Sequence, residues 1–172
     1  HRVHRRQRQM CIRDRVFVTG TLGLAKQGLT ILKSNLKEID LSSKYVSKFI
    51  NPNLNFKFGQ AISSYATSCI DVSDGFISDL GHICQASRVG ASIDSDLIPI
   101  YGELEDALTW GDDYELCFTA PSKAQSDVFN AAKECGVQVS QVGEITEKLE
   151  LEILQNSRLV SFSKSGYNHF DE

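Results

Sequence analysis

One short stretch of the sequence carries three oxygen-bearing side chains, Asp71, Ser73 and Asp74, followed directly by Gly75. In an extended chain the side chains of Asp71 and Ser73 project to the same side. Unpaired N–H groups at a helix start favour an anion such as phosphate, but two carboxylates there would repel it. A Mg²⁺ ion resolves this conflict, because it binds one or two carboxylates and completes its shell with water and phosphate oxygens. The stretch predicts a metal and phosphate site; the alternative is that these residues only cap a helix and form a turn.

The flanking residues predict a strand that runs into a helix at this point. Ser73 or Asp74 is expected to cap the helix. Its apolar residues fall on one stripe: Phe76, Ile77, Leu80, Ile83 and Cys84. Asp79, His82 and Gln85 fall on the opposite face, which we expect to be solvated.

A second acidic pair, Asp112 and Asp113, stands beside Gly111 at the entrance to a strand pattern. Residues 114–119 alternate in the period of two that is typical of a strand. Such a pair is consistent with a solvated turn, and equally with binding of a cationic part of a substrate.

The remaining pattern predicts helices that alternate with strands. Strands are expected at 16–19, 91–94 and 137–142, with a hairpin of 149–154 and 159–162 around residues 155–157. Helices are expected from Leu24, from Ser42 to before Pro52, from Asn55, and from a capping box at residues 122–125 to near Gly136. Gly90 is expected to follow the central helix as its C′ residue, and Gly143 to turn the chain. The class is α/β or α+β in one domain.

Composition limits the function classes. Of the 172 residues, 41% are hydrophobic and 23% charged, which is ordinary for a soluble globular protein. No apolar run is long enough to cross a bilayer, so no membrane partner is expected. The five cysteines are odd in number and lack metal-type spacing. We therefore expect reduced, mainly core cysteines in a cytoplasmic protein.

Residues 1–15 differ from the rest of the chain. They hold six Arg against one acid, a local charge of +5, whereas the remaining residues carry −9. An arm that binds nucleic acid and a targeting peptide are two interpretations. The segment better resembles translated sequencing-adapter read-through, so we expect a non-native or disordered segment at 1–15, a domain at 16–172 and no nucleic-acid partner.

Four segments in the right order resemble a known family. Residues 70–83 and 111–118 are similar to the signature segments of bacterial thiamine-monophosphate kinase, and residues 18–21 and 166–170 to its flanking motifs. The resemblance implies the C-terminal domain of the aminoimidazole-ribonucleotide-synthetase-like fold, a mixed sheet flanked by helices. It also implies transfer of the γ-phosphoryl group of ATP to thiamine phosphate, with Mg²⁺ as cofactor.

The same resemblance implies roles for individual residues. Asp71 and Asp74 would be Mg²⁺ ligands, and Ser73 would contact ATP. Asp112 and Tyr167 would contact the thiamine phosphate. The intact enzyme would be a homodimer.

The resemblance has limits that leave alternatives open. It covers only the C-terminal domain, so this chain is expected to be inactive alone. Trp110 stands where the family usually has Gly, and Asp112 where it commonly has Glu, which alters the shape and reach of the pocket. The alternatives are a free-standing module that binds a nucleotide or phosphate, and a superfamily relative that acts on another small phosphate.

Overall fold

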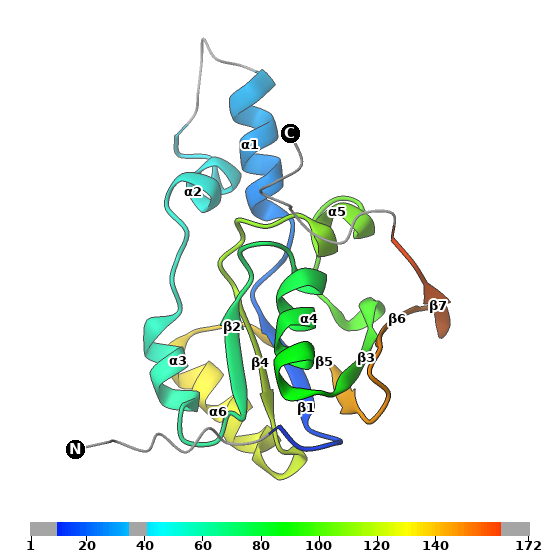
Figure 1. Cartoon of the computed structure of the whole chain (residues 1–172). Coiled ribbons are helices and arrows are strands. Elements are labelled where there is room, and N and C mark those ends of the chain that lie inside the picture. The colour runs from blue at the N-terminus through cyan, green and yellow to red at the C-terminus, as the bar shows by residue number, and fades with distance from the viewer. Residues whose placement is uncertain (1–9, 35–40, 163–172) are drawn as a thin grey trace, which may run out of the picture.

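A mixed sheet of seven strands forms the centre of the molecule in the computed structural model, which describes residues 10–34 and 41–162 (Figure 1). The strands are β1 (Arg15–Thr19), β2 (Ser68–Asp71), β3 (Gly90–Asp94), β4 (Leu116–Ala120), β5 (Val139–Thr146), β6 (Leu151–Gln155) and β7 (Arg158–Val160). Their order across the sheet is β2-β4-β1-β5-β3-β6-β7. Neighbouring strands are antiparallel except β3 and β6, which are parallel. The predicted mixed sheet flanked by helices is confirmed.

Helices cover both faces of this sheet. They are α1 (Leu24–Ser34), α2 (Lys44–Ile50), α3 (Phe56–Ile62), α4 (Phe76–Ser87), α5 (Leu104–Thr109) and α6 (Gln125–Cys135), with short 3₁₀ turns η1 (Ser95–Leu97) and η2 (Ser122–Ala124). α4 lies on one face and α3 and α6 on the other, whereas α1 and α2 extend beyond the sheet (Figure 1). No helix of the described residues is long and apolar enough to cross a membrane.

The alternation of β1 explains the two cores. Val16 and Val18 point into the cluster under α4, whose members include Phe76 and Leu80. Phe17, between them, points into the cluster under α3 and α6. There its ring stacks on Phe118 with centroids 5.1 Å apart. Because this central strand is buried on both faces, its sequence is a continuous apolar run.

The elements α1 and α2 pack as a pair because Gly28 lets their backbones meet. A Cβ at Gly28 would lie 2.2 Å from the backbone oxygen of Tyr45. The pair lies beyond the edge of the sheet at which β1 and β2 end (Figure 1).

The fold includes residues 10–15, although a domain start at residue 16 was expected. Met10 is buried in the core under α4, and the N–H of Arg13 donates to the oxygen of Ile145 at 2.9 Å. Arg15 belongs to β1 and pairs with Glu144 at 2.5 Å. The origin of the Arg-rich segment stays a prediction.

Other boundaries confirm or correct the expectations. The hairpin of β6 and β7 is confirmed, with positive φ at Asn156 and Ser157 as a tight two-residue turn requires. Gly90 is not the C′ residue of α4; Arg88 adopts the left-handed conformation and Gly90 opens β3. Gly143 does not turn the chain, because it lies inside β5 where the pairing with β1 is irregular.

Three further expectations need correction. The six-residue helix α5 was not expected at all. The capping box at 122–125 forms a 3₁₀ turn, and α6 begins only at Gln125 without a side-chain cap. All five cysteines are free thiols, but Cys11 and Cys69 are exposed rather than core residues.

Candidate functional site

Three strand ends meet at one edge of the sheet. β1 ends at Thr19 and β2 at Asp71, and both run antiparallel to β4, which begins at Leu116. Asp71 lies directly opposite Leu116 in the register. The loop that leaves β2 for α4 therefore lies beside the segment that enters β4, and these are the two acidic stretches of the sequence.

Backbone hydrogen bonds join the two stretches. The N–H of Asp112 donates to the oxygen of Ser73 at 3.0 Å, and the N–H of Tyr114 donates to the oxygen of Val72 at 2.9 Å. A Cβ at Gly111 would lie 1.8 Å from the oxygen of Ser73, so only glycine fits there. Asp112 and Tyr114 both have positive φ, so the expected strand starts only at Leu116. Backbone contacts thus hold together two stretches that lie far apart in the sequence.

Asp79 is buried rather than solvated, which contradicts the helical-face expectation. Its side chain is 2% exposed, and its Oδ2 accepts the N–H groups of Ser73 and Asp74 at 2.9 and 3.0 Å. Burial raises the pKa of Asp79, while these two hydrogen bonds favour its ionised form. Neither Ser73 nor Asp74 caps α4; the N-cap is Gly75, with φ of 109°. The N–H groups of Ser73 and Asp74 precede the N-cap, and Asp79 pairs both of them.

Asp113 is neither part of a solvated turn nor available to a cationic ligand. Its side chain is fully buried, and it accepts the N–H of Gly23 at 2.7 Å and of Ala25 at 3.1 Å. It thus caps the first turn of α1 from a distant segment of the chain. Burial raises the pKa of Asp113 to about 6.

Glu115 forms a buried ion pair that the sequence pattern did not predict. Its Oε1 accepts from Nζ of Lys48 at 2.5 Å, and its Oε2 accepts from Oγ1 of Thr19 at 2.5 Å and Nδ2 of Asn55 at 3.0 Å. Gly20 adjoins it so closely that a Cβ there would lie 2.3 Å from the carboxylate. An acid inside an otherwise apolar strand pattern was the available signal, because such an acid needs a buried partner.

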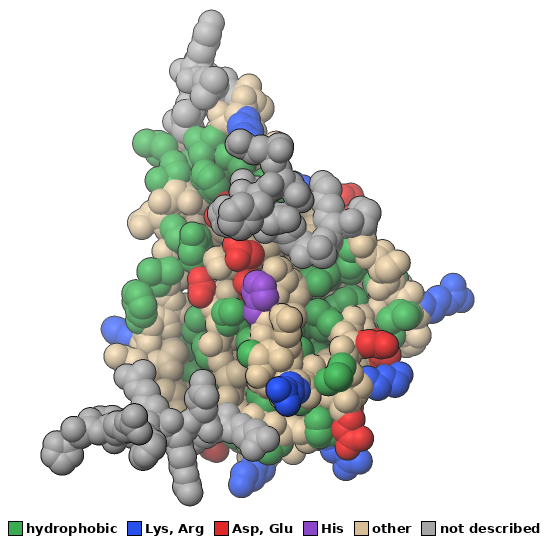
Figure 2. Space-filling view, in the orientation of Figure 1, with side chains coloured by type: hydrophobic (Ala, Val, Ile, Leu, Met, Phe, Trp, Pro, Cys, Tyr) green, Lys and Arg blue, Asp and Glu red, His purple; other side chains and the backbone are tan. Residues whose placement is uncertain are grey.

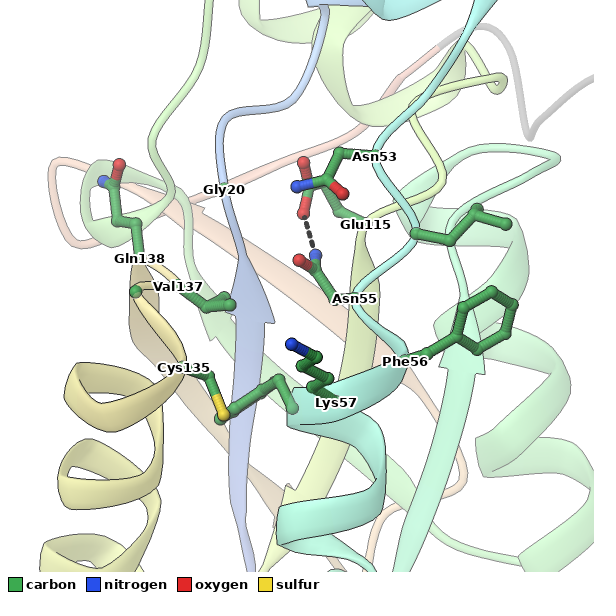
Figure 3. A pocket seen from close by; sticks show the side chains of 12 residues that line it. Gly20, Asn53, Asn55, Phe56, Lys57, Glu115, Cys135, Val137 and Gln138 are labelled. Carbon is green, nitrogen blue, oxygen red and sulfur yellow. Dashed lines mark hydrogen bonds between the residues drawn. The ribbon is translucent and has the colours of Figure 1, made fainter.

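Glu115 and its partner Asn55 line a pocket of about 560 Å³ (Figure 3). Asn55 and Glu115 are joined by a hydrogen bond (Figure 3). Cys135, the last residue of α6, and Gln138, which follows the helix, come from the far side (Figure 3). Of the residues predicted for the site, the four that the structure describes, Asp71, Ser73, Asp74 and Asp112, do not line this pocket.

A second cavity brings together three of the five predicted residues. Ser73, Asp74 and Asp112 line a space of about 480 Å³. Its other walls come from α1 and from the segment that enters β4: Leu29, Lys33, Trp110, Gly111 and Tyr114. We call this space the Asp74 cavity.

Of the other two predicted residues, the structure describes only Asp71. Asp71 is exposed and lines a neighbouring, mostly apolar cavity of about 690 Å³. Tyr114 lines both cavities, so it marks their shared boundary. Tyr167 lies outside the described residues.

The donor set at the β2–α4 loop is compatible with Mg²⁺. Within residues 10–34 and 41–162, no group of three or more His, Cys, Asp or Glu could hold a metal ion. Asp71 and Asp74 flank Ser73 in the sequence, and Mg²⁺ needs only one or two protein carboxylates when water and phosphate supply the rest. Acidic side chains gather beside the single purple histidine on the face that carries β2 and α4 (Figure 2). The arrangement suits a metal shared with a phosphorylated ligand better than a metal held by protein alone.

Comparison with known proteins gives a consistent picture. The family model of the AIR synthase related protein, C-terminal domain, matches residues 14–154. The chain is similar to thiamine-monophosphate kinase of Buchnera aphidicola subsp. Schizaphis graminum, at 37% identity over 170 residues, 91% of this chain and 53% of that protein. It is also similar to thiamine-monophosphate kinase of Escherichia coli strain K12, at 38% identity over 91% of this chain and 52% of that protein.

Solved structures agree with these sequence relatives. Thiamine-monophosphate kinase from Stenotrophomonas maltophilia K279a superposes with a TM-score of 0.77 at 30% identity, covering 86% of this chain and 52% of that one. AaThiL complexed with AMPPCP and TMP superposes with a TM-score of 0.74 at 26% identity, covering 95% and 53%. The chain thus spans about half the length of the curated relatives it matches.

Proposed function

Since the chain belongs to the family of AIR synthase related proteins, C-terminal domain, we propose that it is the C-terminal part of a thiamine-phosphate kinase. The enzyme would transfer the γ-phosphoryl group of ATP to thiamine phosphate and form thiamine diphosphate. The observation that carries the proposal is the Asp74 cavity, where the backbone bond from Asp112 to Ser73 joins the two stretches. The two similar kinases named above and AaThiL, which is complexed with AMPPCP and TMP, support the choice of substrates.

In this proposal the five residues have distinct roles. Asp71 and Asp74 hold Mg²⁺, and the Ser73 hydroxyl contacts ATP. Asp112 and Tyr167 contact the thiamine phosphate. When bound, Mg²⁺ supplies the charge neutralisation that phosphoryl transfer between two anionic substrates needs.

The chain itself supplies positioning. Asp79 fixes the backbone of Ser73 and Asp74, so their side chains start from a constrained loop. Asp113 ties the segment of Asp112 to α1, which brings Lys33 to the same cavity. A Lys ammonium at this rim attracts phosphate oxygens as a point charge. Positioning and electrostatics account for most catalysis of phosphoryl transfer, so rigid support of this kind is what the reaction requires.

Two further properties belong to the proposal. The complete enzyme acts as a homodimer in the cytoplasm, as its resemblance to the kinase family implies. The isolated chain is inactive, because two carboxylates and one hydroxyl hold Mg²⁺ weakly and the chain spans about half of its relatives.

The test is an assay of the product of the complete reading frame that contains this chain. We expect conversion of thiamine phosphate to thiamine diphosphate that requires ATP and Mg²⁺ and stops when EDTA removes the metal. Thiamine and other small phosphates serve as competing substrates. Turnover of another phosphate in preference to thiamine phosphate would refute the substrate, and binding of ATP without any transfer would point to a binding module.

A further inference from the structure

We propose that Trp110 is a specificity-determining residue of the Asp74 cavity, on whose indole a planar, cationic ring of the ligand stacks. The inference rests on the proposed function and adds to it a residue for which the resemblance implies no role. It also names the ligand class that the cavity selects, an aromatic cation that carries a phosphate group.

The backbone fixes where the indole lies. Trp110 directly follows α5, and its N–H donates to the oxygen of Asp106 at 3.0 Å. The next residue, Gly111, packs against the oxygen of Ser73 with no room for a side chain. Trp110 is therefore held at the junction of the two acidic stretches, and it lines the Asp74 cavity.

The side chain is also held. Nζ of Lys26 lies over the indole ring, 5.2 Å from its centroid, and the same ammonium pairs with Asp106. Within the described part of the chain, the buried Nε1 of Trp110 has no hydrogen-bond acceptor. A large side chain with an unpaired buried donor is poorly explained by stability alone. If the indole forms a wall of the cavity against which a ligand ring stacks, the large side chain has a function.

The charges around the cavity define the ring that fits. Asp74 and Asp112 line the same space as the indole. An indole face attracts cations, and carboxylates in the same cavity strengthen that attraction. A neutral ring such as a purine can stack on the indole, but it gains no attraction to the carboxylates. Lys33, on the rim, matches a phosphate on the same molecule.

Thiamine phosphate satisfies these conditions because its thiazolium ring is cationic and it carries one phosphate. Trp110 is also one of the two positions at which the chain departs from its family resemblance, where Gly is usual. The ring wall is thus a property of this chain, and its removal is a direct test.

Because Trp110 is the only tryptophan of the chain, its fluorescence reports on this cavity alone. The experiment titrates the chain with thiamine phosphate, thiamine, inorganic phosphate and AMP, and follows tryptophan emission. We expect saturable quenching by thiamine phosphate and by thiamine, weaker quenching by AMP and none by inorganic phosphate.

Calorimetry with thiamine phosphate then separates contact from proximity. Trp110→Leu should weaken binding by about tenfold, the loss expected for one cation–π contact, whereas Trp110→Phe should stay within about threefold of the parent. Phe129→Leu, on α6 and outside the cavity, is the matched aromatic control and should bind as the parent does. Equal unfolding midpoints for the Leu and Phe variants show that a lost affinity is not lost folding.

The outcomes are distinct. Equal affinities for the parent and both Trp110 variants would overturn the inference and leave the proposed function intact. Equal quenching by AMP and thiamine would overturn the preference for a cationic ring. Absence of any binding to this chain would overturn the inference, while the kinase assay of the complete protein would still decide the proposed function.

Discussion

The buried and half-buried carboxylates of this chain divide by what they bind. Asp79 and Asp113 accept hydrogen bonds from backbone N–H groups, and Glu115 forms an ion pair with a lysine. Asp74 and Asp112 line the cavity instead. The first group stabilises the loops and the second lines the cavity that we propose binds the ligand, so substitutions in the two groups should have different consequences.

Asp79→Asn should destabilise the protein, in contrast to what a solvated helix face implies. The amide oxygen can still accept the two loop N–H groups, which both donate to Oδ2 of Asp79, but it has no charge. Hydrogen bonds to charged groups contribute about 1.5–3 kcal/mol, against about 0.5–1.5 kcal/mol for neutral ones. We expect the free energy of unfolding in urea to fall by about 2 kcal/mol. Asp127→Asn, an exposed acid on α6, is the control and should change it by less than about 0.5 kcal/mol. Equal small effects for both variants would mean that Asp79 does not organise the loop.

Asp113 should make stability depend on pH. Its folded-state pKa of about 6 lies above the roughly 3.9 of an exposed aspartate, so the folded state binds the proton more tightly than the unfolded state. The free energy of unfolding therefore falls as pH rises from about 4 through 6, by roughly 3 kcal/mol for a shift of two pKa units.

Asp113→Asn removes this titration and isolates its contribution, because other carboxylates act equally in both proteins. Urea unfolding at several pH values between about 4 and 7 should give a steeper decline for the parent than for the variant. Parallel profiles would contradict the assignment.

The acidic residues of the site could be identified from the sequence, but the groups that they bind could not. The spacing of Asp71, Ser73 and Asp74 is local, so their proximity could be predicted. A helical wheel places Asp79 opposite the apolar stripe, but it cannot show that the preceding loop folds back over that face. The same holds for Asp113 and Glu115, whose partners lie on distant elements.

At the scale of elements, the contact of α1 with α2 decides where Lys33 and Lys48 lie. Gly28 allows this contact, since any Cβ would meet the backbone oxygen of Tyr45. Gly81 on α4 is the opposite case, because a Cβ added there would meet no atom within 4 Å.

This contrast gives a matched pair of substitutions. Gly28→Ala should force α1 and α2 apart and lower the free energy of unfolding by about 1–3 kcal/mol, as overpacking does. Gly81→Ala should raise it by about 0.5–1 kcal/mol, because alanine favours a helix over glycine. Thermal or urea unfolding measures both. A stabilising Gly28→Ala would show that the two helices do not pack in this way.

Periodicity predicted most elements because their patterns are strong and local. Strands β1 and β3 and the hairpin of β6 and β7 show it in the sequence. The helix α5 was missed because six residues give less than two turns of pattern. β5 continues through Gly143 because β1 and β3 pair with it on both sides, and this long-range support is absent from the local sequence.

At the scale of the whole molecule, the order of the strands determines which segments meet at the candidate site. β1 and β2 both neighbour β4 although they are far apart in the chain, so their ends meet at one edge. Nothing in the sequence pattern orders the strands; the family resemblance supplied that fold. The described residues contain both cores, and the chain spans about half the length of its curated relatives.

The decisive measurement is the turnover of Asp74→Asn in the proposed complete kinase, beside that of Asp127→Asn. We predict that the loss of this proposed Mg²⁺ ligand lowers ATP-dependent conversion of thiamine phosphate by about a hundredfold or more, since substitution of even the outer partners of a metal costs about 10–100-fold. The unfolding midpoint should stay near that of the parent, and Asp127→Asn should keep parental turnover. Parental turnover of Asp74→Asn would contradict the assignment of the metal and phosphate site to the β2–α4 loop.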